Sequence, residues 1–166
     1  HGLTEITNDT SGAKFETSRQ VAERVSDSLK HPLVCYSTGL PKVDAFMLGG
    51  FYPRRMYSFA GRMKDGKSIL AGTFADNMVQ AGHKIFFLTL EMENEELMKR
   101  ILARRMGVPP AEFYSKRNDE AFQVEVGYHA KHDNSNLIMR YEPTITFERM
   151  KQRLHYAVHN RGVKGF

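Results

Sequence analysis

The sequence predicts an α/β fold in which a mainly parallel sheet is flanked by helices. Three observations support this class. A glycine-rich motif, GRMKDGKS at residues 61–68, stands between a short predicted strand and a predicted helix. The apolar run KIFFLTL at residues 84–90 has the length of a buried strand rather than of a capped helix. Further strands and helices alternate along the chain, which is typical of parallel sheets with helical crossovers.

Two elements are predicted before the glycine-rich motif. Residues 38–50 form a short helix that stops at Gly49–Gly50. Its apolar side chains are predicted to be buried; they are Leu40, Val43 and either Phe46 or Met47. The segment MYSFA at residues 56–60 is predicted to be a strand that leads directly into the motif.

The elements after the motif follow clear apolar patterns. Helices are predicted at residues 68–80 and 93–106, on either side of the strand at 84–90. The segment NLIMRY at 136–141 is a further strand, whereas residues 111–136 carry too weak a pattern to predict an element. A last helix has Thr146 as its N-cap and an apolar stripe formed by Phe147, Met150, Leu154 and Ala157 or Val158. The segment VKGF at 163–166 begins another strand.

The start of the chain is predicted to lie outside the main domain. Residues 1–13 are polar and indicate a flexible arm or an expression remnant. Residues 14–32 form a separate helix, with Phe15, Val21, Val25 and Leu29 near one face. Whether this helix packs on its own domain or on a neighbouring subunit stays open. The main domain then extends over residues 33–166.

Composition limits the classes of protein and of partner. The 166 residues are enough for one domain with a sizeable core. Lys and Arg outnumber Asp and Glu by 24 to 19, which favours anionic partners such as nucleotides and nucleic acids. The single cysteine, Cys35, excludes an internal disulfide and fits a reducing cytoplasm. No apolar run approaches the roughly 20 residues of a membrane helix, so we expect a cytoplasmic protein without a membrane partner.

The glycine-rich motif matches the phosphate-binding pattern G-x-x-x-x-G-K-[ST] at every fixed position. Such a loop turns its backbone N–H groups toward phosphate oxygens, and the following helix adds its free N-terminal N–H groups. Lys67 is predicted to reach the β- and γ-phosphates, and the Ser68 hydroxyl to help hold Mg²⁺. A chance match in a glycine turn is the alternative, which the strand–motif–helix context disfavours. The predicted nucleotide-binding residues are Gly61, Arg62, Met63, Lys64, Asp65, Gly66, Lys67 and Ser68.

Glu91 directly follows the apolar strand, 24 residues after Lys67. Ligands bind at the carboxyl ends of parallel strands, so this carboxylate is placed to orient or deprotonate an attacking water. The alternative is a solvated acid at the start of a helix, like Glu93, Glu95 and Glu96. The position of Glu91 at the end of the strand favours the catalytic role.

The segments STGLPKVDAFMLGGFYPRRMYSFAGRMKDGKS and GHKIFFLTLEMENEELMKRILARRMGV resemble the ATPase domain of DnaB-type replicative helicases, within the RecA-like superfamily. The resemblance covers residues 33–166 and is most specific at Thr38–Gly39, Gly61–Ser68 and Leu90–Met92. It implies a RecA-like P-loop core and an ATP-dependent DNA helicase that couples ATP hydrolysis to movement on single-stranded DNA. ATP and Mg²⁺ are the implied cofactors, and Lys67 and Glu91 the implied catalytic residues.

The same resemblance implies partners and missing parts. Single-stranded DNA, further copies of the chain in a hexameric ring, and a primase or helicase loader are the implied partners. The helix at 14–30 would correspond to the linker helix that docks on the adjacent subunit. The segment ITFERMKQRLHYAVHNRGVKGF is similar to the helix and first residues of the Walker B strand. We therefore expect a core that is incomplete at its C-terminus, without the Walker B aspartate, the DNA-binding loops or the arginine finger.

The sequence also departs from the family pattern and leaves other functions open. Met63 and Asp65 replace a usual proline and a frequent methionine of the loop, and an acid beside phosphates opposes their binding. A RecA/RadA- or KaiC-like ATPase, a small-molecule P-loop kinase and a nucleotide-binding module without turnover remain alternatives. The cluster His129, His132 and Asp133 is interpreted as a polar loop rather than as a metal site.

Overall fold

The computed structural model describes residues 15–32 and 34–163. The chain divides into two units, His1–Val34 and Cys35–Phe166. The arm predicted for residues 1–13 lies outside the described residues, as do the last three residues of the strand predicted at 163–166. None of the described helices is both long and apolar enough to cross a membrane.

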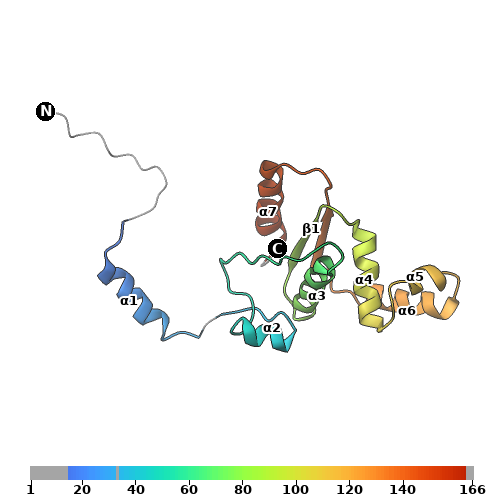
Figure 1. Ribbon diagram of the computed structural model, residues 1–166, viewed down its shortest axis with the longest axis horizontal. Helices are drawn as coiled ribbons and strands as arrows, with labels where there is room; N and C mark the ends of the chain where they lie inside the picture. The colour runs from blue at the N-terminus through green and yellow to red at the C-terminus, as the bar shows by residue number, and fades with distance from the viewer. Residues whose placement is uncertain (1–14, 33, 164–166) are drawn as a thin grey trace. The chain divides into compact units, whose positions relative to one another are not determined.

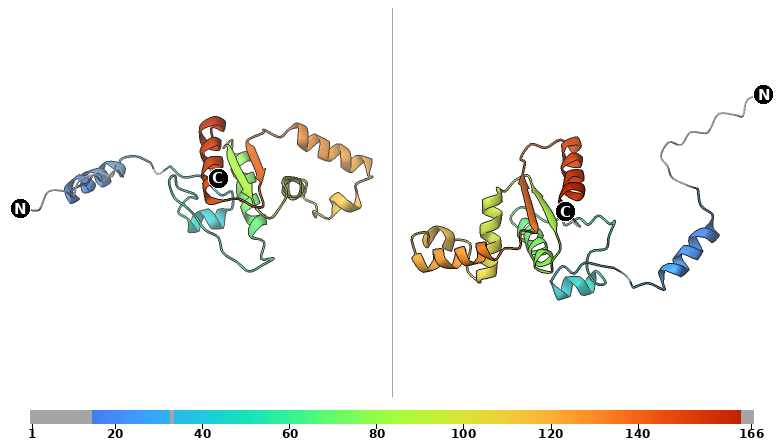
Figure 2. Two further views of the ribbon diagram at one scale, coloured as in Figure 1. Left: turned by 90° about the horizontal axis from the view of Figure 1, so that it is seen from above. Right: turned by 180° about the vertical axis from the view of Figure 1, so that it is seen from behind.

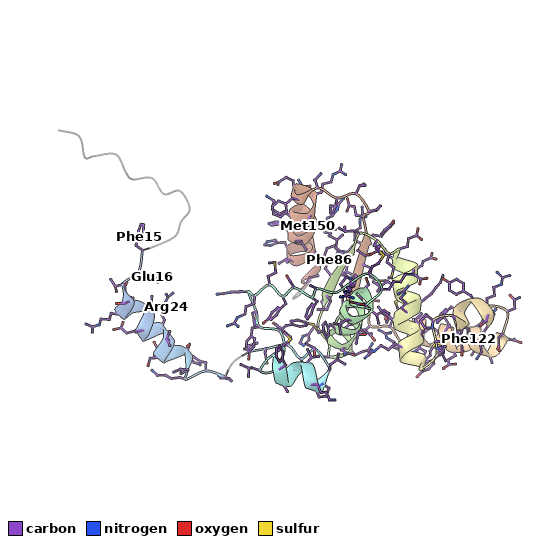
Figure 3. All side chains as sticks on the ribbon, viewed as in Figure 1. Phe15, Glu16, Arg24, Phe86, Phe122 and Met150 are labelled. Atoms are coloured by element: carbon purple, nitrogen blue, oxygen red, sulfur yellow. The ribbon has the colours of Figure 1, made fainter. Side chains whose placement is uncertain are left out.

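The first unit contains one helix, α1 (Ser18–Ser28). Thr17 and Gln20 form a capping box, in which each side chain accepts a hydrogen bond from the backbone N–H of the other. This cap explains why the helix begins at Ser18, later than predicted. Its apolar residues Val21 and Val25 are exposed within the unit, and so is Phe15 before the helix (Figure 3).

A parallel sheet lies at the centre of the second unit. It consists of β1 (Ile85–Thr89) and β2 (Leu137–Tyr141), with Ile85 opposite Leu137 and Thr89 opposite Tyr141. Both strands and their parallel pairing confirm the α/β class predicted from the sequence. In Figures 1 and 2, helix α7 (Phe147–Arg161) lies on one face of the sheet. Helix α3 (Lys67–Gln80) lies on the other face, with α4 (Asn94–Met106) beside it.

Alternating side chains of the strands form a core on each face of the sheet. Ile85 packs with Ala75, Met78 and Val79 of α3, joined by the half-buried Phe87 and Leu137. On the other face, Phe86 packs with Ala157 and Val163, joined by the half-buried Leu88, Ile138 and Leu154. This arrangement confirms the prediction that residues 84–90 form a strand covered on both faces.

The helices predicted after the motif are confirmed. Helix α3 ends before Gly82, which takes a positive φ of 87°. Helix α4 is acidic in its first turn and ends at Gly107 in a left-handed conformation. Helix α7 begins at the predicted cap Thr146, whose side chain accepts from the Arg149 N–H. The predicted stripe is wrong at Phe147, which is 66% exposed and contacts the Lys151 ammonium, 4.9 Å from its ring centroid, rather than the sheet core.

Two helices occupy the segment in which the sequence indicated no element. They are α5 (Glu112–Ser115) and α6 (Glu120–Lys131), and Asp119 caps α6 by accepting from the Phe122 N–H at 3.1 Å. The rings of Phe113 and Phe122 join them in an edge-to-face contact with centroids 5.1 Å apart. Both helices lie on the side of α4 away from the sheet (Figure 1). Phe122 is the only buried residue of α6, so its apolar pattern is weak.

The strand predicted at Met56–Ala60 is wrong. These residues form no strand, and among the described ranges β1 and β2 pair only with each other. A strand requires a neighbour that accepts and donates along its length, which an apolar pattern cannot reveal. Met56 is 92% exposed, whereas the Phe59 ring lies 5.3 Å from the ring of Phe74 on α3. Tyr57 also packs its ring 5.0 Å from the ring of Phe51 and accepts from the Tyr52 N–H at 2.9 Å, so two aromatic side chains rather than a ladder anchor the segment.

The helix predicted before the motif is present as α2 (Pro41–Phe46), but its predicted burial is wrong in part. Leu40, Val43 and Met47 are half-buried rather than buried, and Phe46 is 89% exposed. Because six residues make fewer than two turns, the helix presents only a narrow face to the rest of the unit. The predicted stop is confirmed, since Gly49 and Gly50 both have positive φ.

Candidate functional site

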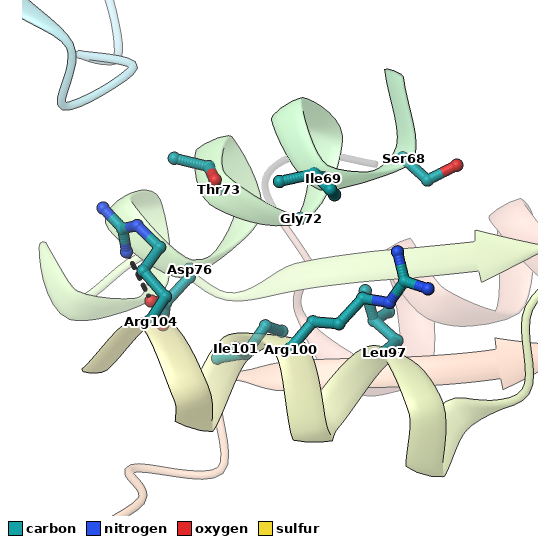
Figure 4. Close-up of a pocket in the computed structure, with 9 residues that line it drawn as sticks. All are labelled: Ser68, Ile69, Gly72, Thr73, Asp76, Leu97, Arg100, Ile101 and Arg104. Atoms are coloured by element: carbon teal, nitrogen blue, oxygen red, sulfur yellow. Dashed lines mark hydrogen bonds and ion pairs between the residues drawn. The ribbon is translucent and has the colours of Figure 1, made fainter. Parts of the chain in front are cut away.

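The glycine-rich loop lies at the end of the sheet where both strands finish. Figure 4 shows Ser68 in the first turn of α3 at the same end of the unit as the tips of β1 and β2. Leu97, in the first part of α4, lies at that end as well. Parallel sheets place their ligands at this edge, so the fold brings the motif to the expected location.

The loop backbone turns sharply before it enters α3. Gly66 is the N-cap in a left-handed conformation, with φ of 83°, and open space surrounds the place where a side chain would begin. Lys64 also has a positive φ, 68°, which is uncommon for a residue with a side chain. In the part of the chain that the structure describes, no side chain caps α3. Its first N–H groups are therefore available to an anion.

The Lys67 ammonium folds back over the loop. Its Nζ donates to the Gly61 carbonyl at 2.9 Å and to the Arg62 carbonyl at 2.7 Å. Both Lys67 and Ser68 are exposed. A cation, an uncapped helix end and an accessible hydroxyl thus stand together, and this set of donors fits a polyphosphate with its divalent cation.

Asp65 lies against the loop itself rather than free in solvent. Its Oδ2 accepts a hydrogen bond from the Arg62 N–H at 2.6 Å. The reverse bond, from the Asp65 N–H to the Arg62 carbonyl, is 3.3 Å long and closes the turn. One backbone donor of the predicted phosphate loop is therefore already engaged by a carboxylate of the same loop.

Glu91 lies in the turn between β1 and α4. The turn is held by the Met92 N–H, which donates to the Thr89 hydroxyl at 3.1 Å, and by the Glu142 N–H, which donates to the Thr89 carbonyl at 3.0 Å. The Glu91 side chain is exposed, at the same edge as the glycine-rich loop. The fold thus brings the two predicted parts of the site to one edge of the sheet.

Glu96, one of the acids weighed against Glu91, has a structural role. It accepts from the Tyr114 hydroxyl at 2.9 Å and pairs with Arg100 at 3.1 Å. The hydrogen bond from Tyr114 and, to a smaller extent, the pairing with Arg100 lower the pKa of the Glu96 carboxyl. This acid joins α4 to α5.

A groove between α3 and α4 extends from the glycine-rich loop. Figure 4 shows the residues that line it: Ser68, Ile69, Gly72, Thr73, Asp76, Leu97, Arg100, Ile101 and Arg104. At its far end the side chains of Asp76 and Arg104 form an ion pair of 2.8 Å. Because Ser68 lines one end, the groove is continuous with the predicted nucleotide site.

Sequence reasoning missed an ionic cluster that joins α3 to α4. Asp76 is 1% exposed and is paired with Arg104 and with Arg105, the latter at 2.7 Å. Arg105 also binds Asp133 at 3.0 Å, so that Asp133 of the predicted polar loop belongs to the cluster. The signal was Asp76 itself, an acid in an otherwise apolar part of α3.

Residues 36–164 match the family described as DnaB-like helicase C terminal domain. Among solved structures, the chain is similar to one described as an ATPase domain, with 17% sequence identity and a TM-score of 0.74. The similarity covers 92% of this chain and 56% of that one, so this chain spans little more than half the length of its structural relative. It shows a shared fold, the predicted RecA-like P-loop core. Among curated proteins, none is significantly similar in sequence.

Proposed function

Because the chain belongs to the family of DnaB-like helicase C-terminal domains, we propose that it is part of an ATP-dependent DNA helicase. In this proposal the protein couples ATP hydrolysis to movement along single-stranded DNA. The observation that supports the proposal is that three elements of the predicted site belong to the same edge of the sheet: Lys67, the uncapped start of α3, and the turn after β1 that carries Glu91.

Each group has a distinct role in the proposed reaction. Lys67 exchanges its contacts with the Gly61 and Arg62 carbonyls for the β- and γ-phosphates, where it offsets their negative charge. The first N–H groups of α3 hold the phosphates in position. Glu91 orients a water for in-line attack and accepts its proton. The Ser68 hydroxyl is the group that would hold Mg²⁺, which when bound supplies further neutralisation of the phosphate charge.

The partners follow from the family rather than from the contacts of this chain. We propose that single-stranded DNA and further copies of the chain, arranged as a hexameric ring in the cytoplasm, are its partners, with a primase or helicase loader as an additional one. In such a ring α1 would be the linker helix that docks on the adjacent subunit. The exposed apolar residues Val21 and Val25 of α1 support this role.

The contact between Asp65 and the Arg62 N–H favours a second candidate function. Because the Arg62 N–H is already bonded to the carboxylate of Asp65, the loop suits a nucleotide-binding module that binds nucleotide weakly and does not hydrolyse it. The two candidates share Lys67 and differ in the role of Glu91. Turnover of ATP in the presence of single-stranded DNA separates them.

Replacement of Lys67 tests the proposed site. We expect Lys67→Ala to weaken MgATP binding about 10- to 100-fold, as for the loss of a charge-assisted hydrogen bond. Isothermal titration of the full chain measures the effect. Lys42→Ala is the matched control, because Lys42 is an exposed lysine on α2, outside the glycine-rich loop. Equal affinity of the Lys67→Ala and Lys42→Ala chains would overturn the phosphate assignment.

A further inference from the structure

We propose that Asp65 sets the affinity of this site for phosphate, by acting in the nucleotide-free chain as an internal anion that the phosphate must displace. The inference rests on the proposed function, because it concerns the same loop. It goes further by assigning a competing role to one residue that the phosphate-binding pattern leaves unspecified.

The first observation is the position of the carboxylate. Asp65 Oδ2 lies 2.6 Å from the Arg62 nitrogen, a short distance that is typical of a charged acceptor. The same oxygen lies 3.4 Å from the point where a side chain on Gly61 would begin. Asp65 thus covers the Gly61–Arg62 backbone, at the start of the loop that would surround a phosphate.

The second observation is that one peptide group is held at both ends by opposite charges. The peptide between Gly61 and Arg62 donates its N–H to Asp65 and accepts, through the Gly61 carbonyl, from Lys67 Nζ at 2.9 Å. Hydrogen bonds at the two ends of one amide polarise it and strengthen each other. The cation and the anion that flank the site are therefore both engaged by the loop itself.

Phosphate binding must break this arrangement. Lys67 has to leave the Gly61 and Arg62 carbonyls to reach a phosphate, and the Arg62 N–H becomes available only when Asp65 moves away. A carboxylate that stayed in place would also repel the phosphate charge. Because Asp65 is exposed, its side chain can turn into solvent without a burial penalty. The displacement is reversible, and its free energy lowers the net affinity.

Three variants of the full chain separate the hydrogen bond from the charge. Asp65→Ala removes both, Asp65→Asn removes the charge and keeps an acceptor oxygen, and Glu95→Gln makes the same change in net charge on an exposed residue of α4. By titration with MgATP at low salt, we expect Asp65→Ala to bind about three- to tenfold more tightly than the wild type. The MgATP affinity of Asp65→Asn should lie between those of Asp65→Ala and the wild type, and the affinity of Glu95→Gln should equal that of the wild type.

Two further measurements make the test independent of ATP turnover. In the nucleotide-free chain, the NMR signal of the Arg62 amide proton should lie downfield in the wild type and move upfield in Asp65→Ala. The affinity gain of Asp65→Ala should also shrink as salt is raised, because part of it is Coulombic. A circular dichroism spectrum like that of the wild type confirms that the variant is folded.

The outcomes distinguish this inference from the proposed function. If Asp65→Ala is folded and binds MgATP no more tightly than the wild type, or if its Arg62 amide signal does not move, the inference is wrong and the site assignment stands. If Lys67→Ala binds as well as the wild type, the site assignment is wrong. If neither the wild type nor Asp65→Ala binds MgATP, both are wrong.

Discussion

Glu91 is the residue on which hydrolysis depends in the proposed mechanism. It is exposed in the turn after β1, and the bonds to Thr89 fix the backbone on either side of it. We expect Glu91→Gln to keep MgATP affinity and to lower DNA-stimulated ATP turnover by about 10²- to 10⁴-fold, the usual contribution of a general base. A coupled phosphate-release assay measures the turnover.

The control for this variant is Glu95→Gln, an exposed acid in the first turn of α4. It removes the same charge further along the chain and should leave turnover unchanged. Normal turnover by Glu91→Gln would make Glu91 a solvated acid and would leave the nucleotide-binding module as the better proposal.

Gly39 has a steric reason to be glycine. Its φ is 73°, and a side chain there would begin 2.5 Å from the Asn77 Nδ2 atom on α3. Asn77 cannot move freely, because it donates to the Thr38 carbonyl at 2.8 Å and accepts from Arg104 at 2.6 Å. Part of the resemblance at Thr38–Gly39 is thus explained by packing of this segment on α3.

We therefore expect Gly39→Ala to lower the free energy of unfolding by about 2–4 kcal/mol, from backbone strain together with the collision. Gly82→Ala is the matched control, since Gly82 has φ of 87° but nothing within 4 Å of the added carbon. Its free energy of unfolding should fall only by the cost of the backbone strain, about 1 kcal/mol. Urea unfolding of the two variants measures the difference, and equal losses would contradict the steric explanation.

At the scale of elements, Asp76 joins the helix that carries the glycine-rich loop to the helix that follows Glu91. It holds Arg104 and Arg105 of α4 while 1% exposed. Removing one partner of a buried pair leaves uncompensated charge. We expect Asp76→Ala to lower the free energy of unfolding by about 3–5 kcal/mol.

The control is Glu148→Ala, which breaks the exposed pair with Lys151 on α7 and should lower the free energy of unfolding by less than about 1 kcal/mol. Thermal and urea unfolding of both variants measure the two losses. Similar losses for the two variants would show that the buried cluster contributes little beyond an ordinary surface pair.

At the scale of the whole second unit, several carboxyl groups make stability depend on pH. Burial of Asp44 by itself raises its pKa, but hydrogen bonds from Ser37, Thr38 and Gly39 outweigh it and hold the pKa below its ordinary value. Arg153 likewise lowers the pKa of Glu142. Because the folded pKa is depressed, the stabilisation is present above the unfolded value of about 4 and is lost as pH falls through the folded pKa.

We expect the free energy of unfolding to fall between about pH 5 and pH 2, and to fall less steeply in Asp44→Asn than in the wild type. Urea unfolding at a series of pH values measures the two slopes. Asp27→Asn, at an exposed acid of α1 in the other unit, is the control. Equal slopes for Asp44→Asn and the wild type would show that Asp44 does not contribute to acid unfolding.

Much of the fold could be predicted from the sequence because its patterns are local. Strand β1 is a short apolar run, α3 and α4 have apolar residues at helical spacing, and Thr146 marks the start of α7. The failures have a common cause. Met56–Ala60 has no strand beside it among residues 15–32 and 34–163, and α5 and α6 are joined by a Phe113–Phe122 contact that no periodicity in the sequence indicates.

By itself, the sequence determined which chemical groups are present: a glycine-rich turn before a helix, a lysine and a serine at the first positions of that helix, and an acid after a strand. These depend on residues that are neighbours in the chain. The backbone turn decided that Asp65 lies against Arg62, three residues earlier, and only the tertiary structure decided that Asp76 meets arginines 28 and 29 residues further along. The physical reason is that a side chain's partner depends on backbone direction and packing, whereas its residue type sets only which partners it can accept.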